Sequence, residues 1–440
     1  MDNRVLIVSY FYPPHVSPGA IRASKFAKYL PEYGWNPIVL TADKNDYVGG
    51  LPLEVPQDSL FRTRQFDVNG LVKRFFGGKD SSIERLNSGK KTLKSRIVSR
   101  GRSIYINIAN FPDGQIGWYP YAKQEGLRII RRHQPKIIFS TSSPVTDHLI
   151  AYELKRKTGL PWVAELRDLW TQNHNFQRAR PLRSLEVGLE KRVLNAADAV
   201  ITVSEPWAEE LRRHVRVPVH VIYNGFDSSD YPSHYPLARP FTISYTGILY
   251  EGNQDPSPLF DAIVAMRDKG LISPKKIRLR FIGKSVDSVL AAASQRGISD
   301  YIEIRETTRR EEALRLQVES ALLLVLSWSG PQRFGWIGLK LYEYFGSGRP
   351  VLAVGPKDCG ASALTARLNA GFVAENAREV EAILVSALSE FENYGDVSFT
   401  PDTKGLQFFE RRNTARELAE ILDRIVRTKP VCLSVAARES

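Results

Sequence analysis

Residues Gly335 to Gly355 have the sequence GWIGLKLYEYFGSGRPVLAVG, which carries the most informative pattern of the chain. Gly335 and Gly338 predict a tight loop, and the apolar spacing that follows predicts a helix ending before Pro350. Residues 351–354 predict a short strand that is covered on both faces. A loop, a helix and a buried strand in this order are typical of a parallel α/β sheet, so the stretch also fits one more packed helix of such a sheet.

The same stretch indicates a ligand. A helix that begins at a glycine offers free backbone N–H groups and the positive end of its dipole to an anion. Glu343 lies about one and a half turns into this helix. Its carboxylate is placed to accept hydrogen bonds from the hydroxyl groups of a ligand whose phosphates lie at the helix start.

Length and composition predict a two-domain protein without a membrane span. The chain has 440 residues, of which 43% are hydrophobic and 25% charged. No apolar run approaches the ~20 residues of a spanning helix. Residues 5–8 are too short for the apolar region of a signal peptide, and two cysteines provide neither a disulfide framework nor a metal site. We therefore expect a cytoplasmic location.

Strand and helix patterns alternate along the chain in two series. We expect a first domain over 1–226, a polar and proline-rich linker over 227–240, and a second domain over 241–406. A charged amphipathic helix is expected over 407–428, crossing back to the first domain, before a tail over 429–440. Strands are expected at 4–9, 37–41, 136–140, 161–167, 199–204, 220–223, 242–246, 277–282, 301–305, 321–326, 351–354 and 371–374. The first loop lacks G-x-G-x-x-G, which weighs against a dinucleotide-dependent redox enzyme.

Most of the net positive charge lies in an insertion over residues 62–102. The chain has a formal net charge of +13, and this segment contains twelve Lys or Arg and three acidic residues. Apolar side chains between the basic ones suit an amphipathic helix on an anionic membrane surface, although a solvated loop is the alternative. The expected membrane-binding residues are Lys73, Arg74, Phe75, Phe76, Lys90, Lys91 and Lys94. No module typical of nucleic-acid binding is recognisable, so nucleic acid is not an expected partner.

Several short segments together resemble one known family. They are YFYPPHVSPGAIR (10–22), FPD with GW (111–118), ELRDLW (165–170), YNGFD (223–227), GILYEGNQDPSPLF (247–260) and KLYEYFGSGRPVL (340–352). In this order they resemble the family 4 retaining glycosyltransferases of the GT-B fold, of the kind that builds bacterial surface polysaccharides. The resemblance covers almost the whole chain. It implies an α/β fold with two Rossmann-like parallel-sheet domains facing across a cleft.

The resemblance also implies an activity. It is the transfer of a sugar from a nucleotide-sugar donor to a saccharide or lipid-linked saccharide acceptor at the inner face of the cell membrane, without a metal or other cofactor. Glu343 would hold the donor ribose, and Gly338 and Leu339 would offer N–H groups to the diphosphate. Arg167 and Asp168 would serve the acceptor side and the chemistry. The full set of expected donor-binding residues is Gly19, Gly247, Lys284, Gly335, Gly338, Leu339, Lys340 and Glu343.

Two departures from the family pattern keep other functions open. The E-x7-E pattern places a first glutamate eight residues before Glu343, where this chain has Gly335. Asn253 and Gln254 stand where some relatives have arginines, and Lys284 and Lys340 are expected to substitute for them. The alternatives are a non-catalytic relative that binds a nucleotide-sugar and, less favoured, a nucleotide-sugar epimerase. His15 and His148 are expected to be structural, and Trp118 and Trp336 to be packing residues.

Overall fold

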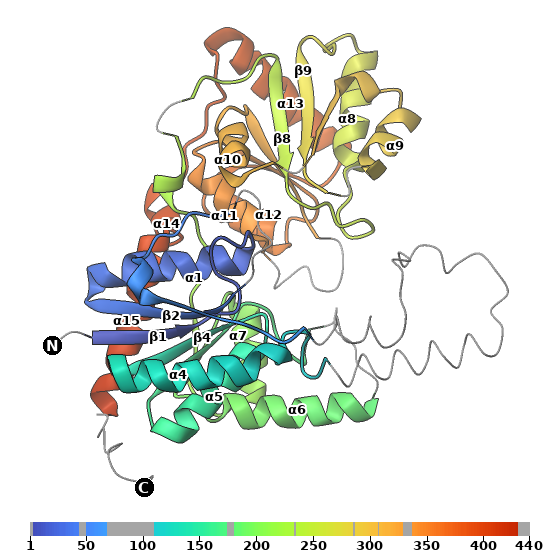
Figure 1. Ribbon diagram of the computed structural model, residues 1–440. Helices are drawn as coiled ribbons and strands as arrows, with labels where there is room; N and C mark the ends of the chain where they lie inside the picture. The colour runs from blue at the N-terminus through green and yellow to red at the C-terminus, as the bar shows by residue number, and fades with distance from the viewer. Residues whose placement is uncertain are drawn as a thin grey trace, which may run out of the picture. The chain divides into compact units, whose positions relative to one another are not determined.

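The computed structural model describes residues 3–43, 50–67, 110–173, 180–232, 235–284, 287–306, 308–328 and 337–429. The chain forms two compact units. The first comprises Met1–Val203, Trp207–Ile222 and Arg416–Ser440, and the second comprises Ser204–Pro206 and Tyr223–Ala415. Each unit has its own sheet and its own helices (Figure 1).

The first unit is built on a seven-stranded parallel sheet. Its strands, in the order β3-β2-β1-β4-β5-β6-β7, are Leu60–Thr63, Trp35–Ala42, Asn3–Val8, Ile137–Ser142, Trp162–Leu166, Ala199–Thr202 and Val219–Val221. The central strands are buried on both faces because helices cover both sides of the sheet.

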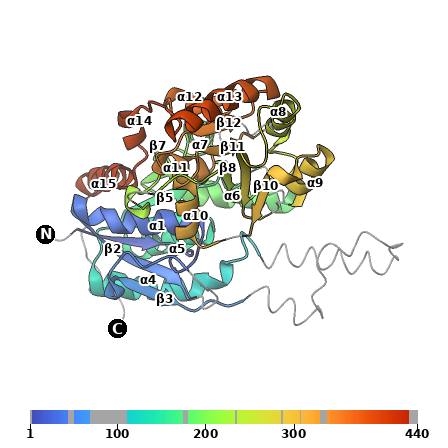
Figure 2. The ribbon, with the colours of Figure 1, turned by 90° about the horizontal axis from the view of Figure 1, so that it is seen from above.

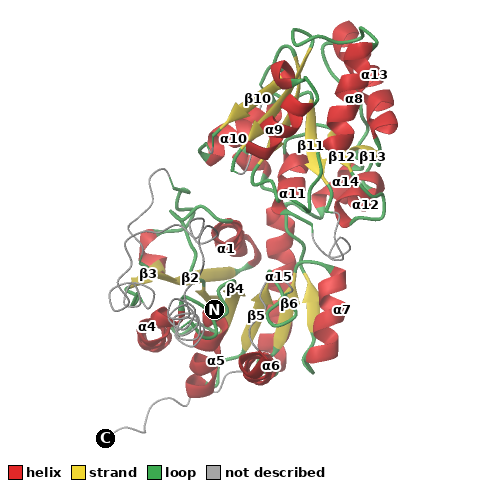
Figure 3. Cartoon of the chain, turned by 90° about the vertical axis from the view of Figure 1, so that its right-hand side faces the viewer, coloured by secondary structure: helices red, strands yellow, loops and turns green. Residues whose placement is uncertain are grey.

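Helices of the first unit lie on either side of this sheet. α1 (Pro18–Tyr29) covers one face, and α4 (Tyr119–His133) and α5 (Thr146–Thr158) cover the other (Figure 3). α6 (Arg180–Leu194) and α7 (Glu205–His214) complete the crossovers, and α7 belongs to this unit from Trp207 onward. The segments η1 (Leu30–Tyr33), η2 (Gln57–Ser59) and η4 (Ile116–Trp118) are short 3₁₀ turns. α15 (Arg411–Thr428) begins in the second unit and belongs to the first from Arg416.

The second unit is built on a six-stranded parallel sheet. Its strands, in the order β10-β9-β8-β11-β12-β13, are Ile302–Arg305, Ile277–Ile282, Phe241–Thr246, Leu322–Leu326, Val351–Val354 and Gly371–Ala374. Residues 339–354, from the glycine-rich stretch, form β12 and the helix before it.

Two hydrophobic clusters divide the helices of the second unit between the faces of its sheet. α8 (Ser257–Asp268), α9 (Asp287–Gln295) and α13 (Ala377–Tyr394) share one cluster, and α8 packs beside α13 (Figure 2). α11 (Leu339–Gly346) and α12 (Gly360–Arg367) share the other cluster. α10 (Arg310–Val318) packs on β8, and η5 (Ser228–Asp230), η6 (Ser299–Tyr301) and α14 (Thr403–Gln407) are short.

The predicted fold class, with two parallel α/β sheets, is confirmed. The sequence missed β3, an edge strand with the sequence LFRT, because its arginine and threonine read as part of the basic segment. Arg62 and Thr63 therefore end a strand of the sheet. The helix expected over 407–428 is present as α15, but it begins at Arg411, because Gln407 ends the separate helix α14. No helix in the described parts of the chain is long and apolar enough to span a bilayer.

Candidate functional site

Two glycine turns follow neighbouring strands of the second sheet. Gly247 ends β8 with φ of +106°, and Gly283 ends β9 with φ of +140°. A Cβ at Gly283 would lie 2.2 Å from the Gly247 carbonyl oxygen. Glycine is therefore required at this close approach, where the backbone of one turn packs directly on the next.

Lys340 lies against the first of these turns. Its ammonium nitrogen is 3.3 Å from the centre of the Tyr245 ring, and a Cβ at Gly247 would lie 3.4 Å from its Cε atom. Burial lowers the pKa of Lys340 well below its ordinary value, and the Glu343 carboxylate opposes that shift. The structure thus brings together Lys340 and Gly247 at the carboxyl end of β8, where ligands of open α/β sheets bind.

The start of α11 lies on the same elements. Gly338 is the N-cap residue and has no side chain, so among the described residues no side-chain cap hydrogen bond occupies the first backbone N–H groups of the helix. The phenolic oxygen of Tyr344 accepts a hydrogen bond of 2.9 Å from the Thr246 backbone N–H. This bond ties α11 to the end of β8 and places Gly338, Leu339 and Lys340 near the glycine turns.

Glu343 forms an ion pair with Arg310, which was not among the predicted site residues. Arg310 begins α10, and its Nη1 forms an ion pair with Oε1 of Glu343. The Arg310 Nη2 lies 3.4 Å from Oδ2 of Asp230. Burial alone would lower the pKa of Arg310, but Glu343 more than offsets this and raises the pKa above its usual value. No local pattern in the sequence indicates this pairing, because Arg310 precedes Glu343 by 33 positions.

Two further predicted positions have different surroundings. Lys284 is exposed directly after Gly283. Gln254 is buried, and its amide donates to the Leu326 carbonyl at 3.0 Å while its oxygen accepts from Tyr245 Oη and from the Tyr250 backbone N–H, each at 3.0 Å. Gln254 therefore holds the loop after β8 instead of offering a charge to a ligand.

Within the first unit, Gly19 and Arg167 are in contact. A Cβ at Gly19 would lie 2.4 Å from Nη2 of Arg167. The Arg167 guanidinium donates to Thr141 Oγ1 at 3.1 Å and to the Ser143 carbonyl at 2.8 Å. Burial lowers the pKa of Arg167, and the adjacent Asp168 opposes that shift. Gly19 belongs to this unit, whereas every other described donor residue belongs to the second.

A buried ion pair between Arg22 and Glu165 is connected to Arg167 through the side chain of Thr141. Arg22 donates to Glu165 Oε1 from Nε at 2.9 Å and from Nη2 at 2.8 Å, and both side chains are fully buried. Thr141 donates to Glu165 Oε2 at 2.6 Å and so connects this pair to Arg167. Charged groups this deep require partners on every polar atom. Glu165 within an otherwise apolar strand was the signal in the sequence that could have revealed this network.

The conspicuous FPD segment and His148 have structural roles. Asp113 accepts from the backbone N–H and the hydroxyl of Thr146, each at 2.7 Å, and thereby caps α5. His148 is buried, its Nδ1 lies 2.8 Å from Ser140 Oγ, and burial lowers its pKa to about 3. Trp118 is fully buried.

Several expected site residues lie outside the described residues. They are Gly335 of the donor set, Trp336, and the membrane-binding residues Lys73, Arg74, Phe75, Phe76, Lys90, Lys91 and Lys94. Their assignments stay predictions from the sequence.

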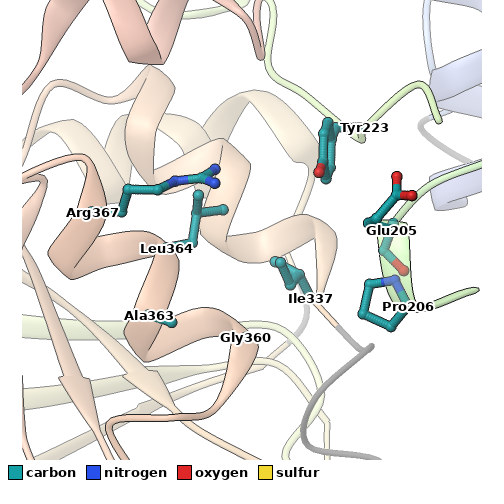
Figure 4. Close-up of a pocket in the computed structure, with 9 residues that line it drawn as sticks. Glu205, Pro206, Tyr223, Ile337, Gly360, Ala363, Leu364 and Arg367 are labelled. Carbon is teal, nitrogen blue, oxygen red and sulfur yellow. The ribbon is translucent and has the colours of Figure 1, made fainter.

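A small pocket lies beside the residue that precedes Gly338. Its lining residues are Ser204, Glu205, Pro206, Tyr223, Ile337, Gly360, Ala363, Leu364 and Arg367, all grouped with the second unit. Figure 4 shows Leu364 and Arg367 of α12 in this lining, with Ile337 nearby. Its volume of about 170 Å³ is below the roughly 300–1,000 Å³ of small-molecule sites. The pocket is therefore too small for a whole nucleotide-sugar.

Comparison with known proteins identifies a glycosyltransferase segment. Residues 88–230 match the family model described as Glycosyltransferase Family 4. A comparison with curated protein sequences finds no match. Over residues 88–230 this match agrees with the family resemblance seen in the sequence.

Solved structures show the same fold. Sucrose-phosphate synthase from Thermosynechococcus elongatus is 13% identical with a TM-score of 0.59, and the match covers 97% of this chain and 100% of that one. Anabaena HepE in complex with UDP and glucose is 14% identical with a TM-score of 0.60, covering 96% and 100%. WaaG, a glycosyltransferase involved in lipopolysaccharide biosynthesis, is 13% identical with a TM-score of 0.51, covering 95% and 99%. The fold is thus the GT-B fold of glycosyltransferases.

Proposed function

We propose that the protein transfers a sugar from a nucleotide-sugar donor to a saccharide acceptor, with retention of configuration and without a metal ion. The family 4 segment and the GT-B fold support a glycosyltransferase. HepE, whose structures hold UDP and UDP-glucose, supports a nucleotide-sugar donor. The lipopolysaccharide enzyme WaaG supports an acceptor of the surface-polysaccharide type.

The observation that carries the proposal is the arrangement at the start of α11. Lys340, Gly338 and the glycine turn at Gly247 lie at one end of the sheet, and Glu343 follows on the same helix. A diphosphate at the helix start would meet backbone N–H groups and the Lys340 ammonium, and both would stabilise the negative charge of the leaving nucleotide. Glu343 would accept hydrogen bonds from the ribose hydroxyl groups.

The acceptor side belongs to the first unit in this proposal. The Arg167 guanidinium is fixed by Thr141 and Ser143, and Asp168 follows it at the end of β5. A fixed cation and a neighbouring carboxylate suit recognition of sugar hydroxyl groups. We expect Asp168→Asn to lower turnover far more than donor affinity; a variant with weakened donor binding and full turnover at saturation would contradict this role.

A nucleotide-binding relative without catalysis is the second candidate function. It rests on Gly335, which replaces the first acid of the E-x7-E pattern. Incubation of the protein with UDP-, GDP- and ADP-sugars, with and without a lipid extract, distinguishes the two candidates. Nucleotide release that requires the extract indicates a transferase, binding without release indicates the relative, and interconversion of free donors would indicate an epimerase.

A further inference from the structure

We propose that Arg310 is a positioning residue that holds the Glu343 carboxylate for the ribose of the donor. The inference rests on the proposed function, because it assigns Glu343 to ribose. Arg310 occupies Oε1 of Glu343 through its ion pair, and we assign Oε2 to a ribose hydroxyl group. A carboxylate held through one oxygen presents the other in a fixed direction.

The topology of the second sheet explains why these two side chains meet. α10 packs on β8 and α11 packs on β11, and these two strands are neighbours. Gln317 of α10 also donates to Thr246 Oγ1 at 3.1 Å, and Thr246 in turn bonds Tyr344 of α11. Both helices follow strands of this parallel sheet and begin at its carboxyl edge, where the side chain of Arg310, the first residue of α10, reaches Glu343 in α11.

The guanidinium group acts as a bridge between two carboxylates. Nη1 pairs with Glu343 and Nη2 lies 3.4 Å from Oδ2 of Asp230. The three side chains remain 16–18% exposed, so a ligand can reach the carboxylate of Glu343. A lysine would keep the charge, but a single ammonium lacks the planar fork that contacts both acids in one geometry.

The backbone of Glu343 is held by the same segment that supplies Asp230. Tyr231 Oη donates to the Glu343 carbonyl at 2.6 Å. One turn further along α11, a Cβ at Gly346 would lie 2.7 Å from Cε2 of Tyr231 and 2.8 Å from Cβ of Phe226. Adjacent residues 230 and 231 therefore fix both the side chain, through Arg310, and the main chain of Glu343. Two restraints on one residue fit a positioning role better than an isolated surface ion pair.

Calorimetry with ribose and deoxyribose nucleotides tests the inference. UDP, GDP and ADP would each be compared with their 2′-deoxy and 3′-deoxy counterparts on the wild type, Arg310→Gln, Arg310→Lys and Glu343→Gln. We expect Arg310→Gln to bind the ribose nucleotide about tenfold more weakly and to lose most of its preference over the deoxy forms. Arg310→Lys should be intermediate, and Arg310→Gln should add little in the Glu343→Gln background.

Arg309→Gln is the matched control. Arg309 precedes Arg310, is exposed and loses the same charge on substitution, so its variant should behave as the wild type. Tighter nucleotide binding by Arg310→Gln would show that Arg310 blocks Glu343 and would overturn the inference. An unchanged preference for ribose in that variant would overturn it as well. A wild type that binds no nucleotide would overturn the proposed function itself.

Discussion

Replacing Gly19 by alanine adds one methyl group, and the structure has no free space for it beside Arg167. The nearest atoms to a Cβ at Gly19 are Nη2, Nη1 and Cζ of Arg167, at 2.4–2.6 Å. These atoms end a flexible side chain, so Gly19→Ala should displace the guanidinium without unfolding the unit. We expect turnover to fall about tenfold, as for a misplaced positioning group, with little change in thermal stability.

Gly188→Ala provides the matched control for this change. Gly188 lies in α6, and a Cβ there would meet nothing within 4 Å. Alanine is favoured over glycine in a helix by about 1 kcal/mol, so this variant should be slightly more stable and fully active. Equal activity of Gly19→Ala and Gly188→Ala would remove Arg167 from the working site.

The lowered pKa of Lys340 predicts that donor affinity depends on pH. Its folded-state pKa is lowered by burial, so the ammonium loses its proton at a lower pH than an ordinary lysine. A diphosphate is held by the charged form only, and affinity should therefore fall as pH rises through this lowered pKa. Calorimetry with UDP between pH 7 and 10 should show a decline in the wild type, whereas Lys340→Met should bind weakly with a flat profile. A wild-type profile as flat as that of the variant would exclude Lys340 from the diphosphate site.

The local sequence predicts the element on which a residue lies, whereas contacts between residues distant in the sequence arise only on folding. Gly338, Leu339 and Glu343 follow from one glycine-led helix. Arg310 is the first residue of α10, a helix that has no glycine-led start, and only the folding of the unit brings it to Glu343. Gln254 stands where some relatives have an arginine, and its burial likewise follows only from the fold.

Among the elements of the second unit, the paired turns after β8 and β9 leave no room for a side chain at Gly283. A Cβ at Gly283 would lie 2.2 Å from a backbone oxygen, at a φ of +140°. We expect Gly283→Ala to lower the stability of this unit by about 1–3 kcal/mol and to weaken nucleotide binding, as measured by denaturant unfolding and calorimetry. Gly270→Ala has positive φ of +71° but open space, so it measures the strain of φ alone. Equal losses in both variants would show that the contact between the turns is unimportant.

The elements themselves were largely readable from the sequence, since strands buried on both faces appear as short apolar runs. Edge elements were harder. β3 lies at the edge of its sheet, is only partly buried and contains Arg62, so it does not appear as an apolar run. Residues 408–410, which separate α14 from α15, did not stand out from the amphipathic pattern of the segment.

For the molecule as a whole, we propose that the basic segment 62–102 binds an anionic membrane. Each Lys or Arg near such a surface contributes about 1 kcal/mol, and the attraction is screened over ~8 Å at physiological ionic strength. Co-sedimentation should show salt-sensitive binding to vesicles with anionic lipid and weak binding to neutral ones. Changing Lys73, Arg74, Lys90, Lys91 and Lys94 to Glu should abolish it; binding that survives this change or ignores lipid charge would contradict the proposal.

The course of α15 has a practical meaning for dividing the polypeptide. From Arg416 onward it completes the first unit, where Asp423 accepts a hydrogen bond of 3.0 Å from Trp35 Nε1 and Lys429 pairs with Asp198. A gene fragment that ends at residue 222 would thus encode a first unit without α15, and the apolar surface that α15 covers would be exposed to solvent. Residues 223–415 form one uninterrupted stretch that holds nearly all of the second unit, so we expect this fragment to fold on its own, whereas a fragment of the first unit must also include residues 416–429.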